Sequence, residues 1–237
     1  MLKIENLTVK YGEKVAVDNL SLHILKGEIY GFIGHNGAGK TSTIKAATGI
    51  LKFTDGEIYV NGVSMKQDAL TCKKNIAYIP DNPDLYDYMT GIQYLNFIAD
   101  IFGVSSALRK DKIEKYAARF EILNDLTAGI SAYSHGMKQK LAVISALIHD
   151  PKLIVMDEPF VGLDPKAAFT LKEIMREHCL AGGSIFFSTH VLDVAEKLCD
   201  KIAIIKAGKL IKSGAINEVK GDESLESVFL ELEGDNA

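Results

Sequence analysis

Short apolar runs and alternating apolar and polar positions dominate the first 80 residues of the chain. A period of two is typical of β-strands, and glycines stand where turns between the runs are expected. One helical stretch, residues 40–48, interrupts this pattern directly after a glycine-rich loop. The predicted strands are residues 3–10, 21–25, 28–33, 55–60 and 76–79. The fourth of them ends at Asn61-Gly62, a strong signal for a hairpin turn.

The hydrophobic pattern changes in the middle of the chain. Between residues 91 and 149, apolar residues recur three and four positions apart, as on one face of an α-helix. After Pro151, strands and helices alternate, which is typical of a mostly parallel sheet covered by helices. The elements predicted in this last part are strand 153–156, helix 165–180, strand 184–188, helix 191–198 and strand 201–206.

These patterns together predict an α/β core that is interrupted by an all-helical insertion. We place the core at about residues 1–83 and 150–212, the helical subdomain at about 84–149 and a C-terminal tail at about 213–237. The tail is acidic, but four of its apolar residues keep helical spacing, so we expect it to pack on the rest of the protein: Leu225, Val228, Phe229 and Leu232.

Composition excludes several classes of protein. The 237 residues are 47% hydrophobic, as in a folded globular chain, and 27 basic against 31 acidic side chains give a net charge of -4. Three arginines among so many lysines argue against a nucleic-acid partner. Three cysteines without C-x-x-C spacing fit a reducing cytosol. We expect neither a signal peptide nor a membrane span, because no apolar run is long enough to cross a bilayer.

The glycine-rich loop carries the clearest chemical signal. Its sequence, GHNGAGKT, fits the phosphate-binding pattern G-x-x-x-x-G-K-[ST] between a predicted strand and a predicted helix, which disfavours a chance match. Glycines let backbone N–H groups turn inward as an anion nest at the helix N-terminus. Lys40 supplies charge for the β- and γ-phosphates, and the Thr41 hydroxyl can ligate Mg²⁺. The predicted ligand-binding residues are Gly34, His35, Asn36, Gly37, Ala38, Gly39, Lys40, Thr41 and Ser42.

The apolar strand 153–156 ends in two carboxylates, Asp157 and Glu158. A central strand that emerges beside the phosphate loop would place Asp157 near the Mg²⁺ and Glu158 opposite the γ-phosphate. Glu158 could then orient or deprotonate the attacking water as a general base. An isolated Asp-Glu pair is more simply a solvated strand end. The phosphate loop in the same chain favours the catalytic interpretation.

Further motifs identify a family. YSHGM at residues 133–137 resembles a signature usually written L-S-G-G-Q, in which Ser134 and Gly136 match and the other three residues depart. Residues 162–164 resemble the D-loop, residues 188–190 the switch segment, and Tyr11 an adenine-stacking aromatic. With the phosphate loop and the acidic strand end, these motifs closely resemble the nucleotide-binding subunit of ATP-binding cassette (ABC) transporters, over essentially the whole chain.

The resemblance implies a P-loop NTPase core with a mixed, largely parallel sheet, an N-terminal antiparallel β subdomain and an inserted helical subdomain, all within one ABC ATPase domain. It implies ATP and Mg²⁺ as cofactors, Asp157 at the metal, His190 at the γ-phosphate and Asp164 in the D-loop. In this family two cassettes stack head to tail, so Ser134 and Gly136 would act across the dimer on the other subunit's ATP. Ser134 could also simply cap the helix that begins there.

One departure concerns the loop after strand 76–79. The family commonly places a glutamine there, which reaches Mg²⁺ and the attacking water, whereas this chain has Asp81 between prolines. Asp81 could touch the metal or its waters, or it could be an ordinary loop residue. Leu85, Tyr86 and Tyr88 follow, where family members touch a membrane partner. They fit a docking patch and equally fit core packing.

The function expected from these features is that of an ATP-hydrolysing motor subunit. It would form a homo- or heterodimer with a second ABC subunit and drive a separate transmembrane permease, as a peripheral protein on the cytoplasmic face of the cell membrane. The variant signature favours an exporter. Two alternatives remain: an ABC ATPase that acts on DNA or the ribosome, and a regulatory subunit that binds nucleotide without hydrolysing it.

Overall fold

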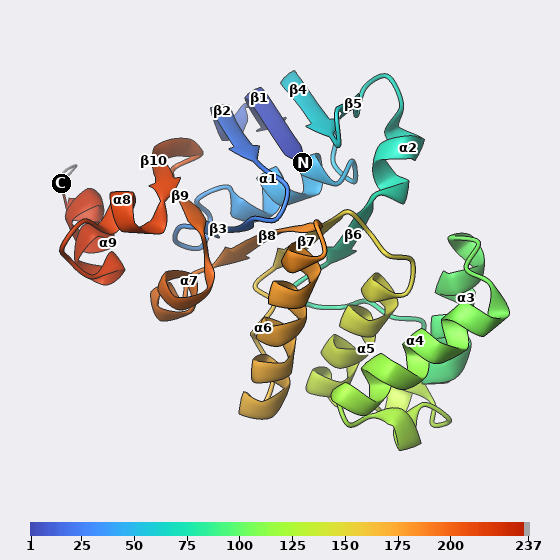
Figure 1. Ribbon diagram of the computed structural model, residues 1–237. Coiled ribbons are helices and arrows are strands. Elements are labelled where there is room, and N and C mark those ends of the chain that lie inside the picture. Colours follow the sequence, from blue (N-terminus) through green and yellow to red (C-terminus); the bar gives the residue numbers. More distant parts are fainter. Residues whose placement is uncertain (235–237) are drawn as a thin grey trace.

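Two β-sheets enclose the helix that follows the phosphate loop (Figure 1). The first sheet is antiparallel, with strand order β2-β1-β4-β5, and contains β1 (Leu2–Tyr11), β2 (Lys14–Ile24), β4 (Asp55–Val60) and β5 (Val63–Ser64). Helix α1 (Lys40–Ala47) lies between this sheet and the second one. The computed structural model describes residues 1–234.

The second sheet has strand order β10-β9-β3-β8-β7-β6, and its central strands are parallel. Its strands are β3 (Ile29–Ile33), β6 (Ile76–Ile79), β7 (Leu153–Asp157), β8 (Ser184–Thr189), β9 (Lys201–Lys206) and the antiparallel edge strand β10 (Lys209–Ala215). Because β3, β8 and β7 are parallel neighbours, their carboxyl ends meet at one edge. The phosphate loop and the acidic pair therefore emerge side by side.

Alternating side chains of the parallel sheet pack into two separate hydrophobic clusters. Phe32, Val155 and Phe186 face α1 and the antiparallel sheet, whereas Met156 and Phe187 face the helices on the other side. Burial on both faces explains why these strands are continuous apolar runs in the sequence. The sheet edge that carries the candidate site is thus held from both sides.

Most helices lie on the far side of the parallel sheet from the N-terminus (Figure 1). Three of them form the insertion between β6 and β7: α3 (Gly91–Ile101), α4 (Ser106–Arg119) and α5 (His135–Leu147). The others are α6 (Pro165–Leu180), α7 (Leu192–Leu198), α8 (Ile216–Lys220) and α9 (Leu225–Gly234), with the short α2 (Ala69–Lys74) beside β5. No helix within residues 1–234 is long and apolar enough to cross a membrane.

Most predicted elements are observed, but β2 begins at Lys14, seven residues before the predicted strand 21–25. Among the elements without a counterpart in the sequence-based prediction are α2, β10 and α8. Helix α2 is short, with one buried residue, so it has almost no apolar period. Strand β10 pairs with β9 through residues that are mostly exposed, and α8 has five residues. The helix expected from the spacing of the tail residues is present as α9.

Candidate functional site

A cavity of about 710 Å³ opens at the carboxyl edge of the parallel sheet, a size in the range of small-molecule sites. It is lined from four directions: by the end of β1 and the β1–β2 turn, by the phosphate loop, by the ends of β6 and β7, and by the β9–β10 turn. The predicted residues that line it are Tyr11, His35, Asn36, Gly37, Gly39, Lys40, Thr41, Ser42, Asp81, Asp157 and Glu158. Gly34 and Ala38 are buried in the loop beneath this surface.

The phosphate loop depends on glycine where it turns into α1. Gly39 has φ 110°, and a Cβ atom there would lie 2.6 Å from the carbonyl oxygen of Ala16. At Gly34 a Cβ would lie 2.5 Å from the carbonyl oxygen of Ile205. Gly39 is also the N-cap of α1, and no side chain caps this helix end. Its backbone N–H groups are therefore directed to the cavity as a ready anion site.

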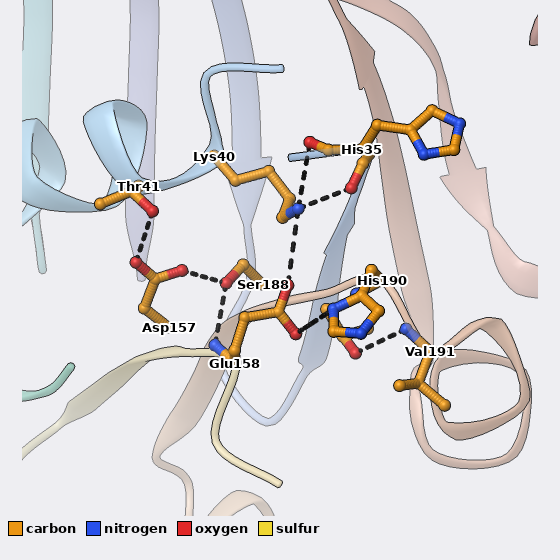
Figure 2. Close-up of polar contacts among 10 residues, drawn as sticks. His35, Lys40, Thr41, Asp157, Glu158, Ser188, His190 and Val191 are labelled. Atoms are coloured by element: carbon orange, nitrogen blue, oxygen red, sulfur yellow. Dashed lines mark hydrogen bonds and ion pairs between the residues drawn. The ribbon is translucent and has the colours of Figure 1, made fainter. Parts of the chain in front are cut away.

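The side chain of Lys40 is almost fully buried and spans the floor of the cavity (Figure 2). Its ammonium donates hydrogen bonds to the carbonyl oxygens of Gly34, at 2.5 Å, and His35, at 3.3 Å. The same Nζ lies 3.5 Å from Glu158 Oε1. The loop carbonyls thus hold the cation beside the carboxylate, where it would meet an incoming phosphate.

Thr41 and Asp157 approach each other from α1 and β7 (Figure 2). Thr41 Oγ1 donates a hydrogen bond to Asp157 Oδ2 at 2.7 Å, and Ser188 Oγ on β8 donates to Asp157 Oδ1. Asp157 is 2% exposed. A hydroxyl and a carboxylate are oxygen ligands of the kind that Mg²⁺ prefers, so the pair fits this ion. Residues 1–234 contain no cluster of three or more acidic, histidine or cysteine side chains placed for a metal.

Glu158 is held in a specific orientation by its neighbours in the switch segment. Its backbone lies in the left-handed region at φ 47°, and its N–H donates to Ser188 Oγ at 3.0 Å. Glu158 Oε2 lies 3.0 Å from His190 Nδ1 and accepts a hydrogen bond from His190 N at 3.3 Å. Its other oxygen, Oε1, is buried, and apart from the ion pair with Lys40 it has no hydrogen-bond partner in the part of the chain that the structure describes. A strained backbone that presents a carboxylate oxygen in need of a donor is typical of a reactive site.

Tyr11 and Asp81 both line the cavity, from the end of β1 and from the loop after β6. Tyr11 is half exposed at the end of β1, and its hydroxyl is 3.4 Å from Ser42 Oγ, so its ring stands beside the phosphate loop. Asp81 follows β6. Burial, together with the charges of Asp157 and Asp81, raises the pKa of Tyr78. Asp81, after β6, and Asp157, at the end of β7, therefore both lie close enough to Tyr78 for their negative charges to act on it.

The signature and D-loop residues lie away from this cavity, on helix N-termini that pack against each other. Ser134 caps α5 by accepting a hydrogen bond from Met137 N at 3.2 Å, and Asp164 caps α6 by accepting one from Ala167 N at 2.8 Å. Lys140 on α5 forms an ion pair with Asp164 at 2.8 Å and lowers the pKa of that carboxyl. Gly136, in the first turn of α5, lies against Gly162. One chain thus does not bring Ser134, Gly136 or Asp164 to its own cavity.

Sequence reasoning missed the lining residues that the start of β2 and the β9–β10 turn add to the cavity. They belong to none of the recognised motifs. The turn between β9 and β10 could have been predicted from Gly208, because glycine is favoured in two-residue hairpin turns. Ala207 and Gly208 have φ values of 47° and 81° in this turn. The missed lining residues are Lys14, Val15, Ala16, Ala207 and Gly208.

The candidate docking patch is only partly exposed. Leu85 is 8% exposed and belongs to the helical core, so its expected role in a docking patch is wrong, and core packing is correct for this residue. Tyr88 is 80% exposed, and Tyr86 is about half exposed within a group of aromatic rings that includes Tyr94 and Phe97. The exposed part of this segment therefore combines these two tyrosines with acidic residues such as Asp84 and Asp87.

A comparison with known protein families decides the identity. A family model described as ABC transporter matches residues 17–161, more than half of the chain. The chain belongs to the ABC transporter family. Its P-loop NTPase fold and its identity as an ATP-binding ABC ATPase subunit, both expected from the motifs, are confirmed.

Several relatives of this ABC subunit are similar over most of its length. The ABC-type transporter ATP-binding protein EcsA of Bacillus subtilis is 32% identical over 242 residues, which cover 100% of this chain and 98% of EcsA. The bacitracin transport ATP-binding protein BcrA of Enterococcus faecalis is 33% identical over 92% of this chain and 70% of BcrA. The chain spans 63% of a longer, 34% identical ABC transporter ATP-binding protein of Nostoc sp.. A solved ATP-binding subunit of an ABC transporter superposes with a TM-score of 0.94 at 32% identity, covering 98% of this chain and 99% of that one.

Proposed function

We propose that this ABC subunit hydrolyses ATP with the help of Mg²⁺ and drives a separate membrane permease. The observation that carries the proposal is the polar network at the carboxyl edge of the sheet. It brings a buried lysine, a hydroxyl and two carboxylates to one cavity: Lys40, Thr41, Asp157 and Glu158. His190, which follows β8, does not line the cavity but contacts Glu158. A nucleotide binder without catalysis would not need a carboxylate held in this way.

Thr41 and Asp157 would hold the Mg²⁺, with Asp157 kept in place by Ser188. The ion, when bound, neutralises charge on the β- and γ-phosphates. Lys40 would leave the carbonyl oxygens of Gly34 and His35 and bind the same phosphates. Tyr11 would stack on the adenine at the outer end of the cavity, and the fit of Asp81 among the lining residues supports a role in orienting water.

Glu158 would act on the attacking water. Oε1 lacks a hydrogen bond within the described residues and would accept a proton from the water as its oxygen attacks the γ-phosphorus. The bond between that phosphorus and the bridging oxygen breaks, and its electron pair stays on ADP. His190 holds Oε2 and keeps Oε1 directed to the cavity. The products are ADP and phosphate.

The signature residues would complete the site of a second cassette. Ser134, Gly136 and Asp164 do not line the cavity of their own chain, and the head-to-tail dimer of the family would bring them to the partner's ATP. The exposed N-terminus of α5 would then serve as a second anion site beside the γ-phosphate. Dimer closure and opening would convert ATP binding and hydrolysis into movement.

We further propose that the partner is a transmembrane permease and that transport is outward. A relative named as a Nod factor export protein, 33% identical, supports this direction. The exposed aromatic residues Tyr86 and Tyr88 would contact the permease at the cytoplasmic face of the membrane.

Replacing Glu158 by glutamine tests the proposal most directly. Glu158→Gln keeps the size and hydrogen bonds of the side chain but removes the base. We expect ATP turnover to fall at least 100-fold, since general base catalysis typically contributes a factor of 10² to 10⁴. ATP binding should persist and accumulate a closed dimer in size-exclusion chromatography with light scattering.

Glu114→Gln, an isosteric change on α4, is the matched control and should leave turnover unchanged. A Glu158→Gln protein that stays monomeric with ATP and turns over at the normal rate would disprove the assignment of Glu158. A wild-type protein that binds ATP but never hydrolyses it, even with its permease, would support a regulatory subunit.

A further inference from the structure

The C-terminal helix α9 packs against α7 and α8, on the side of the molecule where β9 and β10 lie (Figure 1). Leu225, Val228 and Phe229 are buried, with Leu225 and Phe229 in the same cluster as the helices under the parallel sheet. Leu230, next to Phe229, is 62% exposed on the other side of the helix. Helix α9 therefore packs on the protein through one face and exposes the other to solvent.

One contact reaches the phosphate loop itself. The Phe229 ring meets the His35 ring edge to face, with the centroids 5.0 Å apart and the planes at 63°. Figure 2 shows that the His35 imidazole points away from Lys40, while its backbone carbonyl faces the lysine. The two sides of His35 therefore connect α9 to the cation that would bind phosphate.

Two polar contacts fix α9 beside that ring pair. Lys206 Nζ, at the end of β9 before the turn that lines the cavity, donates to the Leu232 carbonyl oxygen at 3.2 Å. Glu196 on α7, the helix after the switch histidine, accepts from Leu225 N at 3.1 Å and pairs with Lys220 at 2.8 Å. Lys220 holds the pKa of Glu196 below its ordinary value. Helix α9 is thus attached both to β9, next to the turn that lines the cavity, and to α7.

We propose that Phe229 is a positioning residue for ATP binding, acting through His35 on the phosphate loop. A loop with several glycines is conformationally free, and ordering it on binding costs entropy. Anchoring one of its side chains to a packed helix lowers that cost and keeps the N–H groups in the geometry of the anion nest. The effect falls on nucleotide affinity, because α9 touches neither Glu158 nor the switch histidine.

This inference rests on ATP being the ligand of the cavity, which the Lys40→Ala variant tests separately. If Lys40→Ala leaves ATP affinity unchanged, the proposed function fails. If Lys40→Ala abolishes binding and Phe229 has no influence, only the role of α9 fails.

The experiment measures ATP affinity of the full chain by isothermal titration and turnover against ATP concentration. Phe229→Ala should raise the Kd and KM for ATP roughly three- to tenfold, the range of an aromatic pair, while kcat at saturating ATP changes less than twofold. Phe229→Tyr keeps the ring and should restore wild-type affinity. Phe229→Leu keeps apolar volume without the ring, and should raise the Kd and KM for ATP as Phe229→Ala does. It replaces Phe229→Ala in the comparison if the alanine variant fails to fold.

Leu230→Ala, one residue along the same helix, is the matched control and should change neither Kd nor kcat. In a double-mutant cycle, Phe229→Ala should add little to His35→Ala, because both remove the same contact. An unchanged Kd for Phe229→Ala and Phe229→Leu would overturn the proposal. A Leu230→Ala effect of equal size, or full additivity with His35→Ala, would overturn it as well.

Discussion

The N-termini of α1 and α5 both carry a predicted ATP-binding motif, but their structures differ. No side chain caps α1, and its first turn opens into a cavity that the same chain builds around it. Ser134 caps α5, and the first turn of that helix packs against the D-loop and does not line the ATP cavity. The N-terminus of α1 thus forms part of a ligand cavity, whereas the N-terminus of α5 is capped by its own side chain and is not part of that cavity.

This difference indicates a division of labour. Backbone groups at an uncapped helix end need an external anion, so α1 is organised for a ligand that binds to the isolated chain. Backbone groups at a capped end are already partly satisfied, so α5 can remain stable until a second subunit brings its ligand. Two predictions test whether the N-termini of α1 and α5 are independent in this way. A third concerns the C-terminal end of α5.

The largest effect is expected at α1. Lys40→Ala removes the buried cation of the phosphate loop and should weaken ATP binding by the isolated subunit at least tenfold, because charged hydrogen bonds contribute about 1.5–3 kcal/mol. Lys138→Ala removes a lysine of α5 that pairs with Asp87 and should leave the affinity within a factor of two. Equal losses in both variants, measured by titration calorimetry, would show that the two helix ends are not independent.

A smaller effect is expected at α5, and it separates capping from catalysis. Ser134→Ala should lower the free energy of unfolding by about 1 kcal/mol, leave ATP affinity of the monomer unchanged and reduce turnover, which needs the dimer. Ser134→Asp restores a capping carboxylate but places negative charge near the partner's ATP. It should recover stability in denaturant titrations and lower turnover further. Recovery of turnover together with stability would mean that Ser134 is only a cap.

The smallest effect concerns the far end of α5, where it meets the core. His149 stacks on Phe102 at 3.7 Å, and its Nε2 lies 3.3 Å from the Ile76 carbonyl oxygen on β6. Burial lowers the pKa of His149, despite the hydrogen bond to Ile76, and the nearby charges are Lys112 and Asp150. The folded state therefore favours the neutral ring. Its contribution to stability is complete above the unfolded pKa of 6.5 and is lost as the pH falls through the lower folded value.

We accordingly expect the free energy of unfolding to fall below pH 6.5, by at most about 1.4 kcal/mol per pH unit for this residue. His149→Leu should flatten that slope. Amide exchange in α5 should accelerate more than exchange in α1 over the same range, after correction for intrinsic rates. A slope that persists unchanged in His149→Leu would assign it to other groups, such as His178, whose pKa burial also lowers.

The sequence predicted those parts of the molecule whose chemistry is local. Strand β7 and the acidic pair were evident because an apolar run ends in two carboxylates, and the phosphate loop because its glycines, lysine and threonine are contiguous. The position of Asp157 beside Thr41 also followed, since parallel strands end at one edge. These features needed no knowledge of side-chain packing.

Other features depend on contacts between distant segments and could not be predicted. The pattern of residues 81–89 gave no reason to bury Leu85 while exposing Tyr88, because the helices that cover one and leave the other lie elsewhere. The αL backbone of Glu158 and its bond to His190 arise from the fit of β7 against β8. The contact between Phe229 and His35 joins opposite ends of the sequence.

The place of the helical insertion between β6 and β7 has a consequence for how the protein folds. These strands are parallel neighbours, so the whole insertion is one crossover connection, and β6 is the edge strand of its sheet. Pairing β6 with β7 must close a long loop before its contacts form, which is entropically costly and slow. We expect β6 to join the sheet last and to open first in hydrogen exchange, ahead of β3 and β8 at the centre.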